Sequence, residues 1–496
     1  MPTLPEYDSW DATRCAELVR AGEVSPQDLL EAAIGRIDTR NGPLNAVVTK
    51  LYDYGRSRLS TLPEDAPFRG VPFLLKDLKL QLRGTVTTNS TRLLRNATAT
   101  ESSVLAQRYE AAGLVVVGKT NTPEFGITGV TESQLRGPCR NPWNHDRTPG
   151  GSSGGSGAAV AARMVPAAHG GDGGGSIRIP ASCNGLFGLK PTRGRVTMAP
   201  FAGEAWGGYV QEHVLTRSVR DSAALLDIAD PPTPGEPYAA PHKERPWTEE
   251  ATAKPGKLKI AFTAETLFAG ETAPECRAAL KDSIALLEDL GHEVVEARPE
   301  FPKDDLVQAY FATVAAGVAY LVSSTAKQAG VRPRAADFEP TTWTLAQIGE
   351  KMPAALLVQH QANIQRAGRT VAAFFEEYDM LVLPTLARPP LRIGERALGT
   401  SQKAQLRALR MLPLKGLLDL ALNTMGTDAL APNPNTQLFN QTGQPAMSVP
   451  LYWTDGGLPI GTQIVGKFGG EGQLFRLAAQ LEEARPWAER SPVQGR

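Results

Sequence analysis

Residues 150–195 read GGSSGGSGAAVAARMVPAAHGGDGGGSIRIPASCNGLFGLKPTRGR, and this stretch is more informative than any other part of the chain. Ser152 lies in a glycine–serine run, and Ser176 follows three consecutive glycines. Successive glycines permit backbone conformations in which N–H groups converge on a developing negative charge. Two hydroxyl groups in such settings predict acyl transfer.

The glycine–serine run at 150–157, taken alone, is typical of a flexible linker. The segment AAVAARM that follows it favours a helix, so we expect an ordered loop that enters a helix N-terminus. GGSSG also fits the G-x-S-x-G nucleophile elbow, which would make Ser152 or Ser153 the nucleophile. That motif needs a strand before the serine, and the preceding RNPWNHDRTP is polar and rich in proline. The nucleophile elbow is therefore kept only as an alternative interpretation of this run.

The glycines before Ser176 have two interpretations of equal weight, an anion-binding nest and a plain turn at a strand end. Asp172 and Arg178 flank this loop. We expect both to hold its shape through local hydrogen bonds and ion pairs rather than to react.

A serine hydroxyl needs a base before it can attack an amide. His169 is the nearest histidine, but its position in Ala-Ala-His-Gly is more typical of a packed side chain. A lysine can serve when burial lowers its pKa towards about 7 to 8. Lys76 lies in the apolar run GVPFLLKDL and is the candidate; the alternatives are a snorkelling lysine or an ion pair with Asp77.

A literal P-loop pattern spans residues 113–120, GLVVVGKT. Its four intervening residues are those of a buried strand, whose N–H groups are used in a sheet and cannot cradle a phosphate. We therefore reject nucleotide binding there.

The 496 residues contain 52 basic and 52 acidic side chains, without long blocks of either charge. This balance argues against nucleic acid or an anionic membrane as a partner and favours a small neutral substrate. The four cysteines are far apart, the N-terminus lacks the order of a signal peptide, and runs such as 114–117 are too short to cross a bilayer. We expect a reduced, cytoplasmic protein.

Strand-length apolar runs alternate with helical patterns, which predicts an α/β fold with strands buried on both faces. Ser25 and Pro26 open an amphipathic helix, and residues 230–257 form a surface connection rich in proline. Residues 386–436 have no clear period and stay unassigned. Strands are expected at 70–78, 114–121, 258–265, 379–385 and twice within 439–466, and helices at 102–113, 154–164 and 472–484. Residues 275–297 are expected to form a helix followed by a strand, and residues 304–378 to be mostly helical.

Several motifs together resemble the amidase signature family: GVPFLLKDL, GKTNTPEFG, NPWNHDRTPGGSSGGSGAAVAA, GGDGGGSIRIPA and FNQTGQPAMSVP…GLPIGTQIVG. The resemblance is clear over about residues 8–230 and 375–487. It implies a large twisted mixed β-sheet core surrounded by α-helices, in one domain over 1–496. We divide that domain into N-terminal helices (1–70), a core with the catalytic residues (71–228), a surface connection (229–257), a second α/β and helical part (258–436) and a C-terminal return to the core (437–496).

The resemblance also implies a Ser-cisSer-Lys triad. Ser176 would be the nucleophile, and Ser152, after a cis Gly151–Ser152 peptide, would relay protons to Lys76. Ser153 would support the relay, and no metal or organic cofactor would take part. The backbone N–H groups of Gly173, Gly174, Gly175 and Ser176 would form the oxyanion hole.

The helical stretch with Tyr310, Phe311 and Val314 lies where this family tends to place the pocket wall, although YFATVAAGVAYLV is equally typical of a core helix. The family commonly has Thr-Asp followed by a non-glycine residue, where this chain has Gly171-Asp172-Gly173. AHGGD, IRIPAS and KPTRGR most resemble the nylon-oligomer-degrading branch, the 6-aminohexanoate cyclic-dimer hydrolases.

The resemblance implies hydrolysis of small neutral amides through an acyl-enzyme. The alternatives are an aryl acylamidase or carbamate-cleaving enzyme with the same triad, the amidase subunit of a tRNA-dependent amidotransferase, and a non-catalytic binding protein. The implied partner is a small-molecule amide substrate, with a monomer or homodimer as the oligomeric state.

Overall fold

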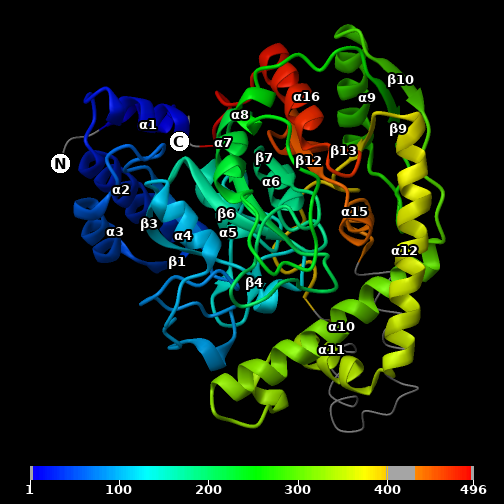
Figure 1. Cartoon of the computed structure of the whole chain (residues 1–496), viewed down its shortest axis with the longest axis horizontal. Coiled ribbons are helices and arrows are strands. Elements are labelled where there is room, and N and C mark those ends of the chain that lie inside the picture. The colour runs from blue at the N-terminus through cyan, green and yellow to red at the C-terminus, as the bar shows by residue number, and fades with distance from the viewer. Residues whose placement is uncertain (1–3, 398, 400–429, 493–496) are drawn as a thin grey trace.

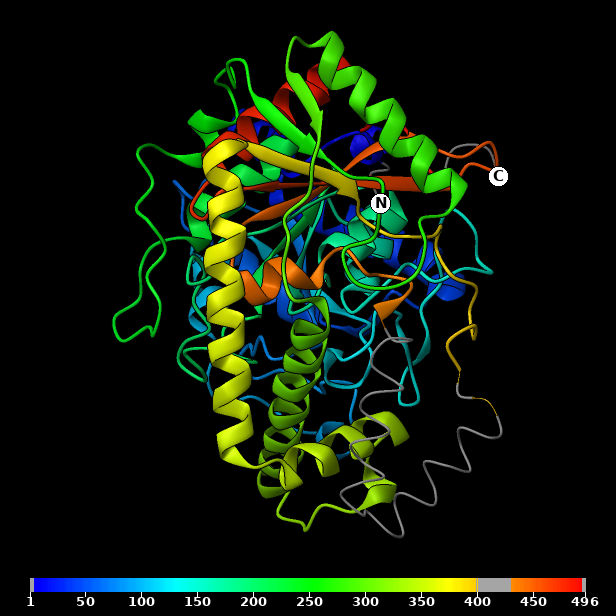
Figure 2. The same ribbon diagram turned by 90° about the vertical axis from the view of Figure 1, so that its right-hand side faces the viewer.

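A mixed sheet of eleven strands forms the centre of the computed structural model, which describes residues 4–397, 399 and 430–492. It contains strands from both halves of the chain (Figures 1 and 2). The strand order from one edge to the other is β1 (Val47–Lys50), β3 (Val115–Thr120), β2 (Pro72–Lys76), β6 (Ala167–Asp172), β8 (Gln211–Thr216), β7 (Phe187–Lys190), β12 (Ala446–Trp453), β13 (Pro459–Gly466), β11 (Met380–Pro384), β9 (Lys259–Phe262) and β10 (Glu293–Glu296).

The sheet is parallel in two places, across β3–β2–β6 and across β11–β9–β10. Its other pairings are antiparallel, so the sheet is mixed, as predicted. The last two strands, β12 and β13, lie between β7 and β11. A separate two-stranded sheet joins β4 (Glu132–Ser133) to β5 (Gly137–Pro138).

Helices surround the central sheet (Figures 1 and 2). The α-helices are α1 (Ala12–Arg20), α2 (Pro26–Leu44), α3 (Tyr52–Arg58), α4 (Val104–Ala111), α5 (Gly154–Ala161), α6 (Arg178–Asn184), α7 (Val219–Ala229), α8 (Trp247–Glu250), α9 (Pro274–Asp289), α10 (Lys303–Gln328), α11 (Pro340–Lys351), α12 (Ala354–Glu377), α15 (Gln437–Thr442) and α16 (Glu471–Ala484). Short 3₁₀ turns lie at Pro5–Asp8, Leu59–Thr61, Arg92–Leu94, Glu124–Gly126 and Ala335–Asp337.

Adjacent residues of β13 show that helices cover both faces of the sheet. A Cβ at Gly461 would lie 2.8 Å from Ser182 Cα of α6. The next side chain, Thr462, is hydrogen-bonded at 2.7 Å to Ser283 of α9. Successive residues of a strand point to opposite faces, so α6 and α9 pack on opposite sides. The strands are therefore buried on both faces, which explains their nearly continuous apolar character.

The predicted helix start at Ser25 is confirmed. Ser25 and Asp28 form a reciprocal capping box, and Pro26 occupies the first helical position. The apolar face of this helix is buried at Leu29, Leu30, Ala33, Ile34 and Ile37.

Two predicted boundaries are wrong. The segment 1–70, predicted as helical, contributes the edge strand β1, whose register with β3 is fixed by long-range pairing. Residues 439–442, predicted as strand, end α15 instead, because Gly443 adopts a left-handed conformation that stops a helix. The strands β7 and β8 were not predicted from the sequence. Much of the segment 386–436, which the sequence left unassigned, lies outside the described residues.

Helix α10 is long and apolar enough, by length and composition, to cross a membrane, the one such helix in the described part of the chain. Core helices of globular proteins pass the same test, and 44% of its most apolar window is buried. It packs against α11 and α12.

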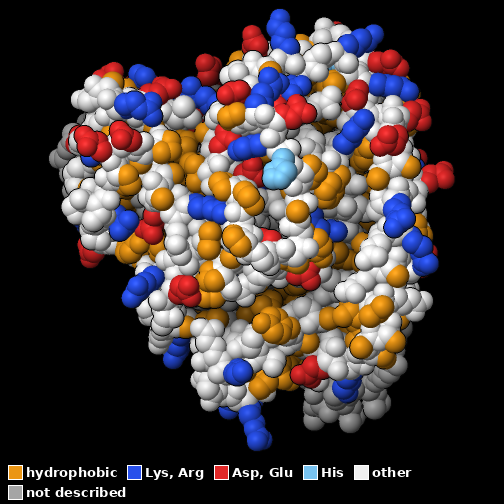
Figure 3. Space-filling model, viewed as in Figure 1, with side chains coloured by type: hydrophobic (Ala, Val, Ile, Leu, Met, Phe, Trp, Pro, Cys, Tyr) orange, Lys and Arg blue, Asp and Glu red, His pale blue; other side chains and the backbone are white. Residues whose placement is uncertain are grey.

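On the face of the molecule shown in Figure 3, basic and acidic side chains are interspersed.

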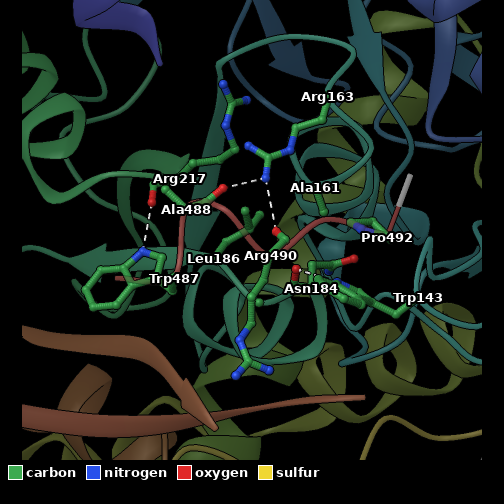
Figure 4. Close-up of a pocket in the computed structure, with 11 residues that line it drawn as sticks. Trp143, Ala161, Arg163, Asn184, Leu186, Arg217, Trp487, Ala488, Arg490 and Pro492 are labelled. Carbon is green, nitrogen blue, oxygen red and sulfur yellow. Dashed lines mark hydrogen bonds between the residues drawn. The ribbon is translucent and has the colours of Figure 1, made fainter. Parts of the chain in front are cut away.

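The C-terminal segment after α16 is fixed to the core by polar contacts. The Arg163 guanidinium donates to the carbonyl groups of Ala488, at 2.7 Å, and Arg490, at 3.0 Å (Figure 4). The Trp487 indole N–H donates to the Arg217 carbonyl at 2.8 Å. The pocket that these residues line contains none of the predicted site residues.

Close packing of α5 explains why its first turn is glycine-rich. A Cβ at Gly155 would lie 2.3 Å from the Asn121 nitrogen and 2.6 Å from the Ala46 carbonyl oxygen, both backbone atoms that cannot move alone. The run is therefore an ordered packing surface between helix and sheet, and the linker interpretation is wrong.

We expect Gly155→Ala to destabilise the protein by about 3 kcal/mol, because the added methyl overpacks two backbone segments. Gly35→Ala is the matched control, since Gly35 is also helical but a Cβ there meets nothing within 4 Å. That control should be neutral or stabilising by up to about 1 kcal/mol. Urea unfolding measures both, and equal stabilities of the two variants would contradict the packing role.

Candidate active site

Lys76 is the last residue of β2, a strand whose five residues are all buried. Its side chain is 1% exposed, and Nζ lies 2.8 Å from Ser152 Oγ and 3.2 Å from the Gly171 carbonyl oxygen. Asp77 instead accepts hydrogen bonds from Thr88. Lys76 thus neither snorkels to solvent nor pairs with Asp77.

Burial lowers the pKa of Lys76 to about 7, because an ammonium loses its hydration inside the protein. The negative charges of Glu212 and Asp172 oppose this effect, and Lys79 adds to it. An amine with such a pKa is partly neutral near physiological pH and can accept a proton.

Ser152 precedes α5 and is 2% exposed, and the Gly151–Ser152 peptide is cis. The next residue, Ser153, holds two loops together: its N–H donates to the Ser176 carbonyl at 3.2 Å, and its Oγ lies 3.3 Å from both the nitrogen and the oxygen of Gly171. Residues 145–151 contain no strand. The strand that a nucleophile elbow requires is therefore missing before Ser152.

Ser176 stands between β6 and α6 and is 8% exposed. The Asp172 carboxylate shapes this loop by accepting the N–H groups of Gly175, at 2.7 Å, and Ile177, at 3.1 Å. Within the described residues, the N–H groups of Gly173, Gly174 and Ser176 donate to no protein acceptor. These three donors are available to an incoming oxygen, while that of Gly175 is already engaged.

The Asp172 carboxylate is neutralised by the Arg178 guanidinium. Both side chains are fully buried, and Nε and Nη2 of Arg178 bind the two carboxylate oxygens at 3.0 and 2.9 Å. This pairing keeps the pKa of Asp172 well below its usual range despite burial. Arg178 also donates to the Thr436 carbonyl, Asn440 Oδ1 and Gln463 Oε1, all from the C-terminal part of the chain.

His169 lies inside β6, with Nε2 at 3.1 Å from Glu212 Oε2 and its ring edge-on to Tyr109. Among the described residues it makes no hydrogen bond to Ser152 or Ser176. The structure therefore brings Lys76, rather than the nearest histidine, to the serine loops.

Aromatic side chains press against the glycine loop before Ser176. A Cβ at Gly174 would lie 2.1 Å from the Tyr310 hydroxyl oxygen, and one at Gly173 would lie 3.0 Å from the Trp206 ring. Tyr310 stacks on Tyr209 with ring centroids 5.8 Å apart.

The structure thus brings Tyr310, from α10, to the loop. Phe311 packs edge-on against Tyr310 at 5.4 Å, and Val314 is buried in the same apolar cluster. For those two residues a role in the pocket wall stays a prediction.

Several residues at the site were not predicted from the sequence. Thr436 Oγ1 donates to the Gly174 carbonyl at 2.7 Å, and Asn440 Nδ2 donates to Asp172 at 2.9 Å. Trp206, Lys79 and Glu212 also surround the loop. Lys79 follows Lys76 by three residues, and Asn440 lies in the motif FNQTGQPAMSVP, but no local pattern indicates that either side chain lies beside the glycine loop.

The sequence model of the amidase family matches residues 28–475. The chain is 38% identical to the 6-aminohexanoate-cyclic-dimer hydrolases of Pseudomonas sp. (strain NK87) and Paenarthrobacter ureafaciens over 500 aligned residues, covering 99% of this chain and 98% of each relative. The chain therefore belongs to the amidase signature family and is an amide-hydrolysing enzyme.

Two solved structures make the relationship more specific. A 6-aminohexanoate cyclic dimer hydrolase complexed with substrate superposes with a TM-score of 0.88 at 36% identity, covering 98% of this chain and 99% of the other. A bacterial aryl acylamidase of the amidase signature family superposes with a TM-score of 0.85 at 27% identity and the same coverage. The fold predicted from the sequence is thereby confirmed.

We expect Arg178→Met to destabilise the protein by about 3–5 kcal/mol at neutral pH, because it leaves the buried Asp172 charge without its partner. The low pKa of Asp172 makes the wild-type contribution complete above pH ~4, the unfolded carboxyl pKa, and removes it as pH falls through the folded value. In the variant the pKa of Asp172 rises, so this carboxyl becomes protonated and loses its unpaired charge at a higher pH. The difference in the free energy of unfolding between wild type and variant should therefore become smaller as pH falls towards ~4.

Urea unfolding at pH 7.5 and pH 5 measures this difference. Arg298→Met is the control, because the Arg298–Glu265 pair is exposed and should contribute less than about 1 kcal/mol. Similar losses in both variants would contradict a special role for the buried pair.

Proposed function

We propose that this chain is a serine amidase in which Lys76, Ser152 and Ser176 act together through an acyl-enzyme. The observation that carries the proposal is the 2.8 Å hydrogen bond between Lys76 Nζ and Ser152 Oγ, both buried. The backbone bond from Ser153 to Ser176 links that pair to the loop of the third residue.

In the first step, Ser176 Oγ forms a bond to the amide carbonyl carbon, and its proton passes through the Ser152 hydroxyl to neutral Lys76. The C–N bond then breaks, and the proton returns through Ser152 to the leaving amine. Water attacks the resulting ester by the same route, which releases the acid and restores Ser176. No oxidant, metal or organic cofactor enters this balance.

The tetrahedral intermediate carries a negative oxygen that needs hydrogen-bond donors. We assign this task to the N–H groups of Gly173, Gly174 and Ser176, which have no described protein acceptor. Gly175, also predicted for the oxyanion hole, already donates to Asp172 and would shape the loop.

We infer that the substrate is a small neutral amide of the 6-aminohexanoate cyclic-dimer kind. The resemblance to hydrolases of that dimer over the full chain supports this substrate class. Tyr310 and Trp206 against the glycine loop suit an apolar chain or ring rather than a charged group. An aryl acylamide or carbamate is the second candidate, since the aryl acylamidase superposes on this chain with a TM-score of 0.85, close to the 0.88 of the cyclic dimer hydrolase.

We further propose that the enzyme works in the cytoplasm as a monomer or homodimer, with neither nucleic acid nor membrane as a partner. The equal numbers of acidic and basic residues argue against nucleic-acid and membrane partners. Activity of the purified chain alone would exclude the tRNA-dependent amidotransferase alternative, which needs partner subunits.

We expect Ser176→Ala to abolish labelling by a fluorophosphonate probe, because the variant lacks the attacking oxygen. Ser153→Ala should only slow labelling, because it removes a hydroxyl that holds the loops without reacting. Intact-protein and peptide mass spectrometry would locate the adduct. An adduct on Ser152 in the wild type would overturn this assignment and restore the nucleophile elbow.

We expect amine release from 6-aminohexanoate cyclic dimer and small aliphatic amides by the purified chain. A panel that also includes linear oligomers, anilides and carbamates, read by mass spectrometry, measures the preference. Turnover of anilides or carbamates without turnover of the cyclic dimer would assign the enzyme to the second candidate class.

A further inference from the structure

Glu212 occupies space that a side chain at position 171 would need. Gly171 of β6 pairs directly with Glu212 of β8, and a Cβ at Gly171 would lie 2.3 Å from Glu212 Oε2. The same Gly171 accepts the Lys76 ammonium on its carbonyl oxygen at 3.2 Å. Lys76 and Glu212 therefore both contact one residue of β6.

The Glu212 carboxylate is held in a buried polar cluster. It is 7% exposed, and His169 Nε2 lies 3.1 Å from its Oε2. The fully buried Tyr109 of α4 packs edge-on against the His169 ring, with centroids 6.4 Å apart. Burying a carboxylate costs free energy unless a cationic or hydrogen-bonding group lies beside it. The burial of Glu212 next to His169 therefore indicates that this position requires a carboxylate.

Among the described residues, the charged groups that act on Lys76 are Glu212 of β8, Asp172 at the end of β6 and Lys79 on the segment after β2. Arg178 neutralises Asp172 through a bidentate ion pair. Glu212 is thus the carboxylate near Lys76 whose charge is not matched by a bidentate arginine, and Lys76 and Lys79 both lie in its field.

We propose that Glu212 is a positioning residue of the active site: its buried carboxylate fills the space beside Gly171 and places a negative charge next to the glycine whose carbonyl binds Lys76. This inference rests on the proposed role of Lys76 as the base. Glu212 would be a fourth side chain of the site beside Lys76, Ser152 and Ser176, and His169 would hold its carboxylate in position.

The charge of Glu212 stabilises the ammonium form of Lys76 and opposes the effect of burial. Without it, the pKa of Lys76 falls, and the neutral base persists to lower pH. The rise of kcat/KM on the acidic side of the pH profile should then move downwards. The neutral lysine would also become a weaker base towards the Ser176 hydroxyl, so kcat at high pH should fall.

The test is the pH dependence of kcat/KM for Glu212→Gln, with a simple amide as substrate. We expect its acidic limb to shift down by about one pH unit relative to the wild type. Glu212→Asp, which keeps the charge, should retain a limb near the wild-type position. A lowered kcat in Glu212→Gln with an unmoved limb would mean a structural role only, and would overturn the proposal.

His213→Gln is the matched control, since His213 is the next residue of β8, is fully buried and bonds to Ser222 instead. The acidic limb of the kcat/KM pH profile of His213→Gln should stay at the wild-type position. If Glu212→Gln does not fold, Gly171→Thr combined with Glu212→Gly removes the same charge while filling its space, and should shift the limb equally. An unmoved limb in that pair would likewise overturn the proposal.

Lys76→Ala separates this inference from the proposed function. Full activity in Lys76→Ala would contradict the role of Lys76 itself. An inactive Lys76→Ala together with an unmoved limb in Glu212→Gln would contradict only the role of Glu212.

Discussion

The buried ion pair between Asp172 and Arg178 connects the reactive loop to the rest of the protein. Asp172 accepts backbone N–H groups on the loop, and Arg178 carries the opposing charge from the first turn of α6. Since α6 starts only two residues after Ser176, the pair fixes both ends of the segment that holds this serine. Two buried charges persist only when their geometry is good and the remaining donors are satisfied. Thr436, Asn440 and Gln463 satisfy those of Arg178.

The C-terminal part of the chain, which returns to the centre of the sheet, supplies these partners. Asn440 of α15 binds both Asp172 and Arg178, and Gln463 of β13 binds Arg178. Residues more than 250 positions after the loop thereby determine its shape. A site built on packed strands and helices, with polar contacts around each reactive group, holds its geometry better than one built on a free loop.

Burial also favours the neutral form of Lys76, the proposed base. Lys76 ends a strand that is apolar along its length, and loss of hydration favours its neutral form. The neighbouring carboxylates differ in their pairing, because Asp172 is bound by a guanidinium and Glu212 by an imidazole contact. Pairs of ionisable groups with different environments are typical of enzyme sites.

The sequence by itself determined the α/β class, most element positions, the capped helix at Ser25 and the importance of Ser152 and Ser176. These follow from local patterns, such as apolar runs of strand length and glycines beside a serine. Lys76 stood out only as a charge in an apolar run, and its choice over His169 needed the family resemblance. The pairing of Lys76 with Ser152 was implied by the same resemblance and not by any local pattern. Tertiary structure alone decided the strands β1, β7 and β8, and the placement of Glu212, Trp206 and Asn440 around the loop. Those contacts join residues far apart along the chain, and a local pattern cannot specify which distant backbone a side chain will meet.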